Sequence, residues 1–480
     1  MRSKFSKPDT SFWIFTASVL ILLTVPKLVR DGMFLDGMLY TSVAHNLGNG
    51  TGTFWQPVFS PFWSNAGSGF FHEHPPLALG IQALFFKVLG DSMYVERFYI
   101  FLTMTITAFL IAAVWRIIFR GNESIRGMAW LPVLLWFLIP TVPWSYSNNM
   151  MENTMGLFAL AGVLFSLRGC EKEKNSFVSF ALSGLFIFMA TMSKGVPGFF
   201  PIAVPFIYWL IFRKGNFYRP VLQTLIVVLV PAIAYFILFR IPESRESLMF
   251  YVKARLLQRI DESPTVTNRL YVFGRVFSEL APLLALTAIA FILLRLKRNE
   301  LMKKINYRYA AFFFLAGVAA SAPLALTMVQ RGFYLVPSFP YFAIAFSVLL
   351  APAAFETRNK ILSGTKSLAI LKYSGFALII VALILSVILR SEPVRDKKVL
   401  HDVHLIGHTI PGRSAITVSD GLYGANYSLE CYFIRYYNIA LHINEPEKYL
   451  LALKEGEKPD TTVFSRVKLD TRVYDLYEKR

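Results

Sequence analysis

The fold class is decided by WIFTASVLILLTV at residues 13–25 and SGFALIIVALILSVIL at residues 374–389. Neither run contains a charged residue, and each lies within a longer, mainly apolar segment, residues 11–30 or 369–390. Helices of about 20 residues are long enough to cross a hydrocarbon core of about 30 Å. Comparable segments recur along a chain that is 55% hydrophobic. Their apolar residues are continuous and do not alternate with polar ones, which excludes a membrane β-barrel. The sequence therefore predicts an all-α protein that crosses a membrane many times.

Eleven membrane spans and additional juxtamembrane helices are expected. When Met1 is placed on the cytoplasmic side, every inner loop is rich in Lys and Arg, as the positive-inside rule requires. The N-terminal MRSKFSK resembles the start of a signal peptide, but no small-x-small cleavage site follows the apolar run directly, so we expect an uncleaved first span. The spans cover residues 11–30, 95–119, 127–145, 151–168, 176–192, 196–213, 219–240, 277–296, 309–329, 333–352 and 369–390.

The net charge of +19 comes mainly from the short loops between the spans. Positive charge in these loops is what the positive-inside rule predicts for a membrane protein. It therefore does not indicate a nucleic-acid partner. The two cysteines, Cys170 and Cys431, fall on opposite sides of the membrane in this topology, so we expect no disulfide between them.

Residues 75–90, PPLALGIQALFFKVLG, form an apolar segment that is short for a span. Counting it as a span would invert the topology downstream and would place the basic loops outside. We therefore expect a juxtamembrane or re-entrant helix on the outer side, with Pro75 and Pro76 in its first turn, where a missing N–H costs little. This helix lies in the first outer segment, residues 31–94, and a second long outer loop covers residues 241–276.

The composition becomes less apolar beyond residue 390. Three patterns follow: a β-like run with a turn in SAITVSDGLYG, an amphipathic helix pattern in EPEKYLLALKEG and a strand-like run in TTVFSR, at residues 414–424, 445–456 and 461–466. We expect residues 391–480 to form a small extracytoplasmic α/β domain that follows a transmembrane domain at residues 1–390.

Two cations lie where the topology should not place them. Lys194 in ATMSKGVPG and Arg331 in TMVQRGFYL are the only cations in the short outer turns. They share the outer face with three carboxylates, those of Asp36, Glu73 and Glu152. A lysine at a helix end can simply extend its charge into water. Two cations on the side where positive charge is rare favour instead a site for an anion such as phosphate.

Each carboxylate also has a simpler explanation. Asp36 precedes a predicted surface helix and could accept a proton from a hydroxyl, hold a metal or an amine, or serve only as a helix cap. Glu152 opens a span, where the helix dipole favours an acidic residue. Glu73 is flanked by His72 and His74, and an H-x-H pair with a carboxylate can bind zinc. Two histidines without further ligands are usually not a metal site, so no metal is predicted, and a divalent ion stays an open alternative at these three residues.

No predicted span has a charged residue near its middle. Ion-coupled transporters usually depend on ionisable groups within the membrane. The charged residues gather at the membrane surface instead, which favours chemistry at that surface over transport through the helices.

Together these residues resemble the GT-C glycosyltransferases, in the branch of bacterial protein O-mannosyltransferase-like enzymes and lipid A aminoarabinose transferases. The resemblance covers residues 11–350. Its first half rests on an acidic residue with a downstream Tyr, an acidic-x-Pro-Pro turn before a helix ending in Leu-Gly, and an Arg that opens the next span. Its second half rests on an acidic residue that opens a later span, a Lys-Gly turn and an Arg-x-x-Tyr-Leu-x-Pro-x-x-Pro motif. The residues are, in this order, Asp36 and Tyr40; Glu73, Pro75, Pro76, Leu89 and Gly90; Arg97; Glu152; Lys194 and Gly195; and Arg331, Tyr334, Leu335, Pro337 and Pro340.

The resemblance implies a sugar donor linked to polyprenyl phosphate, with its lipid among the spans and its phosphate at the outer face. Asp36 would be the base that activates the acceptor hydroxyl for inverting attack, with Glu152 as the second catalytic residue. The donor phosphate would be bound by Lys194, Arg331, Tyr334 and His74, the last standing where aminoarabinose transferases have a lysine. The acceptor or the sugar would be positioned by Glu73, Tyr40, Arg255 and Arg259, the last two in a lid formed by residues 241–276.

The resemblance leaves the sugar open between a hexose and a pentose, and the acceptor open among lipids, glycans and proteins. It implies a bacterial inner membrane, with a cytoplasmic N-terminus and a periplasmic C-terminal domain. Two other functions are alternatives to sugar transfer. A transporter or flippase of lipid-linked glycans would need a continuous polar path through the spans, and a non-catalytic scaffold would leave the charges of the outer face unexplained.

Overall fold

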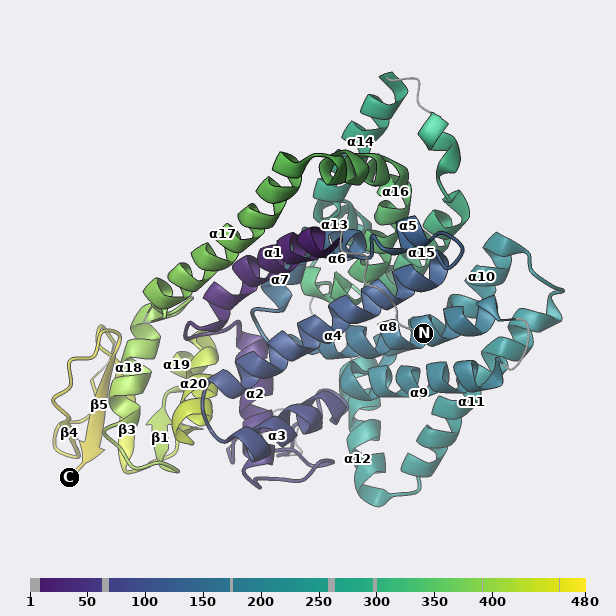
Figure 1. The fold of residues 1–480 in the computed structure, drawn as a ribbon. Helices are drawn as coiled ribbons and strands as arrows, with labels where there is room; N and C mark the ends of the chain where they lie inside the picture. Colours follow the sequence, from purple (N-terminus) through teal and green to yellow (C-terminus); the bar gives the residue numbers. More distant parts are fainter. Residues whose placement is uncertain are drawn as a thin grey trace.

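A computed structural model describes residues 9–62, 69–172, 176–257, 264–296, 300–390, 392–456 and 458–480. Long helices make up most of the molecule, and a small sheet lies at one end beside the C-terminus (Figure 1). Within the described residues, eight helical segments are long and apolar enough to cross a membrane. They are α1 (Thr10–Leu28), α4 (Tyr94–Ile118), α8 (Met151–Glu171), α9 (Phe177–Lys194), α11 (Tyr218–Leu238), α15 with η7 (Tyr307–Leu326), η8 with α16 (Gly332–Ser363) and α17 (Thr365–Leu389).

Three of the eleven predicted spans are bent or broken. Helices α13 (Tyr271–Glu279) and α14 (Ala281–Leu296) meet at an angle of 58° and qualify as a ninth span only as a pair. Residues 127–145 form two short helices, α6 (Trp130–Phe137) and α7 (Thr141–Ser145), separated at Pro140. Residues 196–213 form the 3₁₀ helix η3 (Val196–Ala203) and α10 (Val204–Phe212). Prolines in these two segments lack the N–H of a regular helix and obstruct the preceding turn, so a single long helix does not form.

Residues 75–90 form the helix α3 (Leu77–Leu89), as predicted. Thirteen residues of helix measure about 20 Å along the axis, which is less than the hydrocarbon thickness. Helix α3 packs against α2 (Leu35–Gly48), where Gly48 lies so close to Phe86 that a side chain at this position would clash. Shorter elements complete this part of the chain: α5 (Glu123–Arg126), α12 (Pro242–Phe250), the π-helix η4 (Tyr251–Leu257) and η6 (Glu300–Lys304).

The C-terminal part contains a five-stranded sheet in the order β2-β1-β3-β5-β4. Strand β1 pairs in parallel with β2 and β3, and β5 pairs antiparallel with β3 and β4. The strands are β1 (Ala415–Val418), β2 (Ala440–Ile443), β3 (Tyr449–Leu453), β4 (Phe464–Arg466) and β5 (Tyr474–Lys479), and the helices are α18 (Lys397–Gly407), α19 (Asp420–Ala425) and α20 (Ser428–Tyr437).

The two predicted strands form, but the turn predicted after the first of them is the helix α19, and the predicted helix is wrong. Strands β1 and β4 form within SAITVSDGLYG and TTVFSR, but EPEKYLLALKEG contains β3 where we predicted a helix. Its apolar run, residues 449–453, lies between β1 and β5 in the sheet, and Tyr449 and Leu451 are buried. Pairing on both sides therefore outweighs the helical pattern of the isolated sequence.

Helix α20 fixes the C-terminal part to the helices of the bundle. It packs against α2, where the Ser42 hydroxyl donates a hydrogen bond of 3.0 Å to the carbonyl of Cys431. The guanidinium of Arg435 lies 2.9 Å from the carboxylate of Glu96 at the start of α4, and it also donates to the carbonyls of Asp91 and Ser92. Arg435 and Glu96 are only 2% and 0% exposed, so this ion pair is sealed from water.

We predict that Arg435→Ala destabilises the protein, because it leaves the Glu96 carboxylate charged and buried without its partner. Removal of one member of a buried ion pair costs about 3–5 kcal/mol. The measurement is the midpoint of thermal unfolding in detergent. Lys448→Ala is the control, because its ion pair with Glu478 is exposed and its loss should leave the midpoint unchanged. Equal midpoints for the two variants would contradict this account.

Candidate functional site

A buried lysine is the centre of the candidate site. Lys194 is the last residue of α9, and its side chain is only 7% exposed. Its ammonium lies 2.8 Å from Oε1 of Glu152, which stands in the first turn of α8 and is 1% exposed. A charge this deep needs an opposite charge beside it. The pair therefore holds the end of α9 against the beginning of α8.

Two tyrosines enclose the ammonium of Lys194. It lies 3.5 Å from the hydroxyl of Tyr40 and 5.3 Å from the centre of that ring. The ring of Tyr334, from the 3₁₀ helix η8 (Gly332–Ser338), is 5.7 Å away. Aromatic faces attract cations at such distances, and the attraction strengthens where water is excluded. The site thus joins α2, α8, α9 and η8.

Asp36 reaches the same site from the first turn of α2. It precedes Tyr40 by four residues, so the two side chains lie on one face of the helix. Asp36 is half-buried and close enough to Glu152 for the two carboxylates to interact electrostatically. Gly37 permits this approach, because a side chain there would clash with the carbonyl of Asn148.

The turn before α8, SYSNNM at residues 145–150, contacts the site, but the sequence did not lead us to predict this. Asn148 Oδ1 accepts a hydrogen bond of 2.8 Å from the N–H of Phe34, and Asn149 Nδ2 donates to Thr41 and Gln82. Asn149 has a left-handed backbone with φ of 49°, which asparagine tolerates better than most residues. The Asn-Asn pair in SYSNNM was the available signal, because it combines this backbone preference with side chains that bond to neighbours.

The residues around Glu73 point to three separate partners. Nε2 of His74 lies 3.2 Å from the hydroxyl of Tyr40, and Nε2 of His72 lies 2.9 Å from the carbonyl of Trp55. Burial lowers the pKa of the His72 imidazole. Glu73 forms an ion pair with Arg255. In the part of the chain that the structure describes, no group of three or more His, Cys, Asp or Glu side chains is arranged to hold a metal ion.

The predicted lid contacts the turn that follows Lys194. The N–H of Val196 donates a hydrogen bond of 3.2 Å to the hydroxyl of Tyr251, the first residue of the π-helix η4. Arg255 in the same helix pairs with Glu73. Gly195 has φ of +93°, and a side chain there would clash with Tyr251. Tyr251 of the predicted lid therefore lies directly on the Lys-Gly turn.

The structure brings together most of the predicted site residues, but not all. Those linked by contacts are Asp36, Tyr40, Glu73, His74, Glu152, Lys194, Arg255 and Tyr334. The side chain of Arg331 is exposed and makes no ion pair within the described residues, although its carbonyl accepts from the N–H of Tyr334. Arg259 lies outside the described residues.

Comparisons with known proteins agree with this architecture. Residues 73–246 match the family described as "Dolichyl-phosphate-mannose-protein mannosyltransferase". The crystal structure of ArnT from Cupriavidus metallidurans bound to undecaprenyl phosphate superposes with a TM-score of 0.66 at 14% identity, covering 97% of this chain and 98% of ArnT. The crystal structure of an oligosaccharyltransferase from Archaeoglobus fulgidus in complex with Zn and sulfate superposes with a TM-score of 0.50 at 13% identity. The match covers 92% of this chain and 68% of the oligosaccharyltransferase chain. No curated protein sequence matches the chain.

The fold is therefore that of the GT-C glycosyltransferases. The similarity to the ArnT fold extends over almost the whole length of both chains. The predicted fold class, a polytopic helical membrane protein with a small C-terminal α/β part, is confirmed.

We predict that Gly195→Ala destabilises the protein, because it introduces both an unfavourable left-handed backbone and a clash with Tyr251. Strain of this kind costs about 1–3 kcal/mol and should lower the midpoint of thermal unfolding. Gly274→Ala is the control, because no atom lies within 4 Å of the added methyl group. The account fails if Gly195→Ala is as stable as Gly274→Ala.

Proposed function

We propose that the chain is a membrane glycosyltransferase that takes its sugar from a polyprenyl-phosphate donor. The observation that carries the proposal is the buried Lys194, fixed by Glu152 between two tyrosines at the end of a membrane helix. The similar proteins support it, since ArnT was crystallised with undecaprenyl phosphate and the matched family is described by a dolichyl-phosphate sugar. Both molecules are lipid phosphates.

The Lys194 ammonium is suited to the donor phosphate. Its Nζ forms an ion pair of 2.8 Å with Glu152 and a long hydrogen bond of 3.5 Å to the hydroxyl of Tyr40. An ammonium has three N–H donors, so it can also donate to a phosphate oxygen. As the bond between the sugar and the phosphate breaks, negative charge develops on the leaving phosphate, and a fixed cation stabilises that charge. His74, Tyr334 and Arg331 are proposed to share this role from the surrounding elements.

Asp36 is proposed as the catalytic base. Its carboxylate would accept the proton of an acceptor hydroxyl while the hydroxyl oxygen forms a bond to the anomeric carbon. The bond from this carbon to the phosphate oxygen breaks on the opposite face, so the configuration is inverted. Glu152 is proposed as the second catalytic residue, because its ion pair with Lys194 holds the phosphate-binding ammonium in place.

The remaining predicted residues are proposed to position the sugar or the acceptor. Glu73 and Arg255 join the lid to the loop before α3, and Tyr40 lies between His74 and Lys194. Arg259 would extend the lid. The acceptor is a lipid, a glycan or a protein, and the sugar a hexose or a pentose. We place the site at the outer face of a bacterial inner membrane, with the N-terminus in the cytoplasm and residues 391–480 in the periplasm.

We predict that Lys194→Ala weakens the binding of undecaprenyl phosphate to the purified protein at least about tenfold, because the phosphate loses its buried cation. Lys214→Ala serves as the matched control, since Lys214 is half-exposed and pairs with Glu171 rather than Glu152. The double variant Lys194→Met with Glu152→Gln removes both buried charges, so it tests binding without an uncompensated carboxylate. Equal affinity of wild type and all three variants would contradict the proposal.

We predict that Asp36→Asn lowers the turnover number about 10²–10⁴-fold, because the amide cannot accept the proton. The measurement is transfer of radiolabelled sugar from a membrane donor pool to membrane acceptors, and undecaprenyl phosphate binding should persist. Asp420→Asn, an exposed carboxylate of the C-terminal part, is the control. Normal turnover in Asp36→Asn would exclude the base role. Translocation of the glycolipid without its consumption would indicate a flippase.

A further inference from the structure

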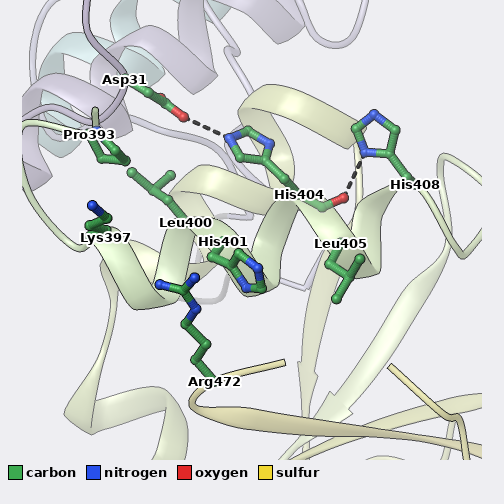
Figure 2. Close-up of a pocket in the computed structure, with 9 residues that line it drawn as sticks. All are labelled: Asp31, Pro393, Lys397, Leu400, His401, His404, Leu405, His408 and Arg472. Atoms are coloured by element: carbon green, nitrogen blue, oxygen red, sulfur yellow. Dashed lines mark hydrogen bonds and ion pairs between the residues drawn. The ribbon is translucent and has the colours of Figure 1, made fainter. Parts of the chain in front are cut away.

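A cavity of about 530 Å³ opens at a second place, away from Lys194. It lies between the segment that follows α1, the helix α18 and the connection from β4 to β5 (Figure 2). No residue of the proposed transferase site lines it. Its chemistry therefore requires an explanation of its own.

The lining of this cavity is rich in groups that carry or can accept positive charge. His401, His404 and His408 recur on α18 and its end at a spacing of three and four residues, which places them on one face. Figure 2 shows Arg472 extending from the opposite side toward His401. Lys397 lines the same cavity from the first turn of α18.

The two cations are available to a ligand. Arg472 is exposed and has no acidic partner within the described residues. Lys397 pairs with Glu392 at 2.5 Å, but both side chains are about half-exposed, with fractions of 58% and 48%. Ion pairs in water are weak, so Lys397 can exchange this partner for a better one.

The acidic groups beside the cavity are already occupied. Asp31 accepts hydrogen bonds from Tyr436 at 2.5 Å and from His404 at 2.7 Å. Burial alone would raise the pKa of Asp31, but these bonds bring it below its usual value. The carboxylate of Asp402 accepts three backbone N–H groups, from residues 472–474. The cavity therefore presents mainly positive charge to a ligand.

The position of the cavity relates it to the membrane surface. Asp31 follows the end of α1 by three residues, and Pro393 follows the end of α17 by four. These two spans pack along each other (Figure 1). The guanidinium of Arg30 ties the two segments together through the carbonyls of Glu392 and Pro393, each at 2.8 Å. The cavity thus lies where two neighbouring spans leave the membrane.

We propose that this cavity binds the phosphate of a membrane-lipid headgroup. Arg472 and Lys397 would bind the phosphate oxygens, since arginine matches phosphate with paired hydrogen bonds. Leu405 and Pro393, which are partly exposed, would contact the apolar part of the headgroup and its first methylene groups. A bound lipid would fix the C-terminal part at the membrane surface. The inference does not depend on the proposed transferase function.

The test measures binding of short-chain phosphatidic acid to the purified full-length protein, with inorganic phosphate as the second probe. We expect Arg472→Ala and Lys397→Ala each to weaken lipid binding about tenfold. Lys398→Ala is the matched control, because Lys398 is the exposed neighbour of Lys397 and does not line the cavity. Undecaprenyl phosphate binding should stay normal in Arg472→Ala and Lys397→Ala, so a failure of the donor site is distinguishable from a failure here.

Three outcomes would overturn the inference. The first is no lipid binding by the wild type, and the second is equal binding by Arg472→Ala, Lys397→Ala and Lys398→Ala. The third is inorganic phosphate binding as tightly as phosphatidic acid, which would identify free phosphate as the ligand and not a lipid. Arg472 and Lys397 are exposed, so their replacement should leave the midpoint of thermal unfolding unchanged and the comparison valid.

Discussion

The ion pair between Lys194 and Glu152 is the interaction on which the rest of the site depends. Its two charges are almost completely buried, and each alone would cost several kcal/mol. Together they fix the end of α9 against the start of α8, and the tyrosines complete the enclosure of the ammonium. The left-handed turn at Gly195 follows directly, and Tyr251 of the π-helix η4 contacts that turn. A cation held in this way has a fixed position and little contact with water.

The C-terminal part supports the site through α2. This helix carries Asp36 and Tyr40 on one face, and it contacts α20 through the hydrogen bond from Ser42 to Cys431. The buried pair of Arg435 and Glu96 then joins α20 to α4. Asp36 therefore stands on a helix held from two sides: by the turn before α8 and by the C-terminal part. In its proposed role as the base, Asp36 would gain from such fixed support.

The sequence predicted the site best where the order of the spans limits which residues can lie close together. Lys194, Glu152 and Asp36 lie close together in the structure, and the predicted order of the spans had put these three residues on one membrane face. The pair of Arg435 and Glu96 could not be predicted, because it joins residues 339 positions apart and follows no local pattern. The wrong helix at residues 445–456 has a related cause, since its strand is stabilised by neighbours that the local pattern does not contain. Arg331 shows the limit of the topological argument, because a shared face does not ensure contact.

The most direct measurement is the structure of the protein in a lipid nanodisc with added undecaprenyl phosphate, determined by electron cryomicroscopy. The account predicts a phosphate within hydrogen-bond distance of Lys194 Nζ, about 2.7–3.2 Å, with Glu152 still paired to the same ammonium. The lipid chain should lie among the spans, and Asp36 should face the open side of the site. A phosphate bound elsewhere, with Lys194 still enclosed only by Glu152, Tyr40 and Tyr334, would contradict the central claim.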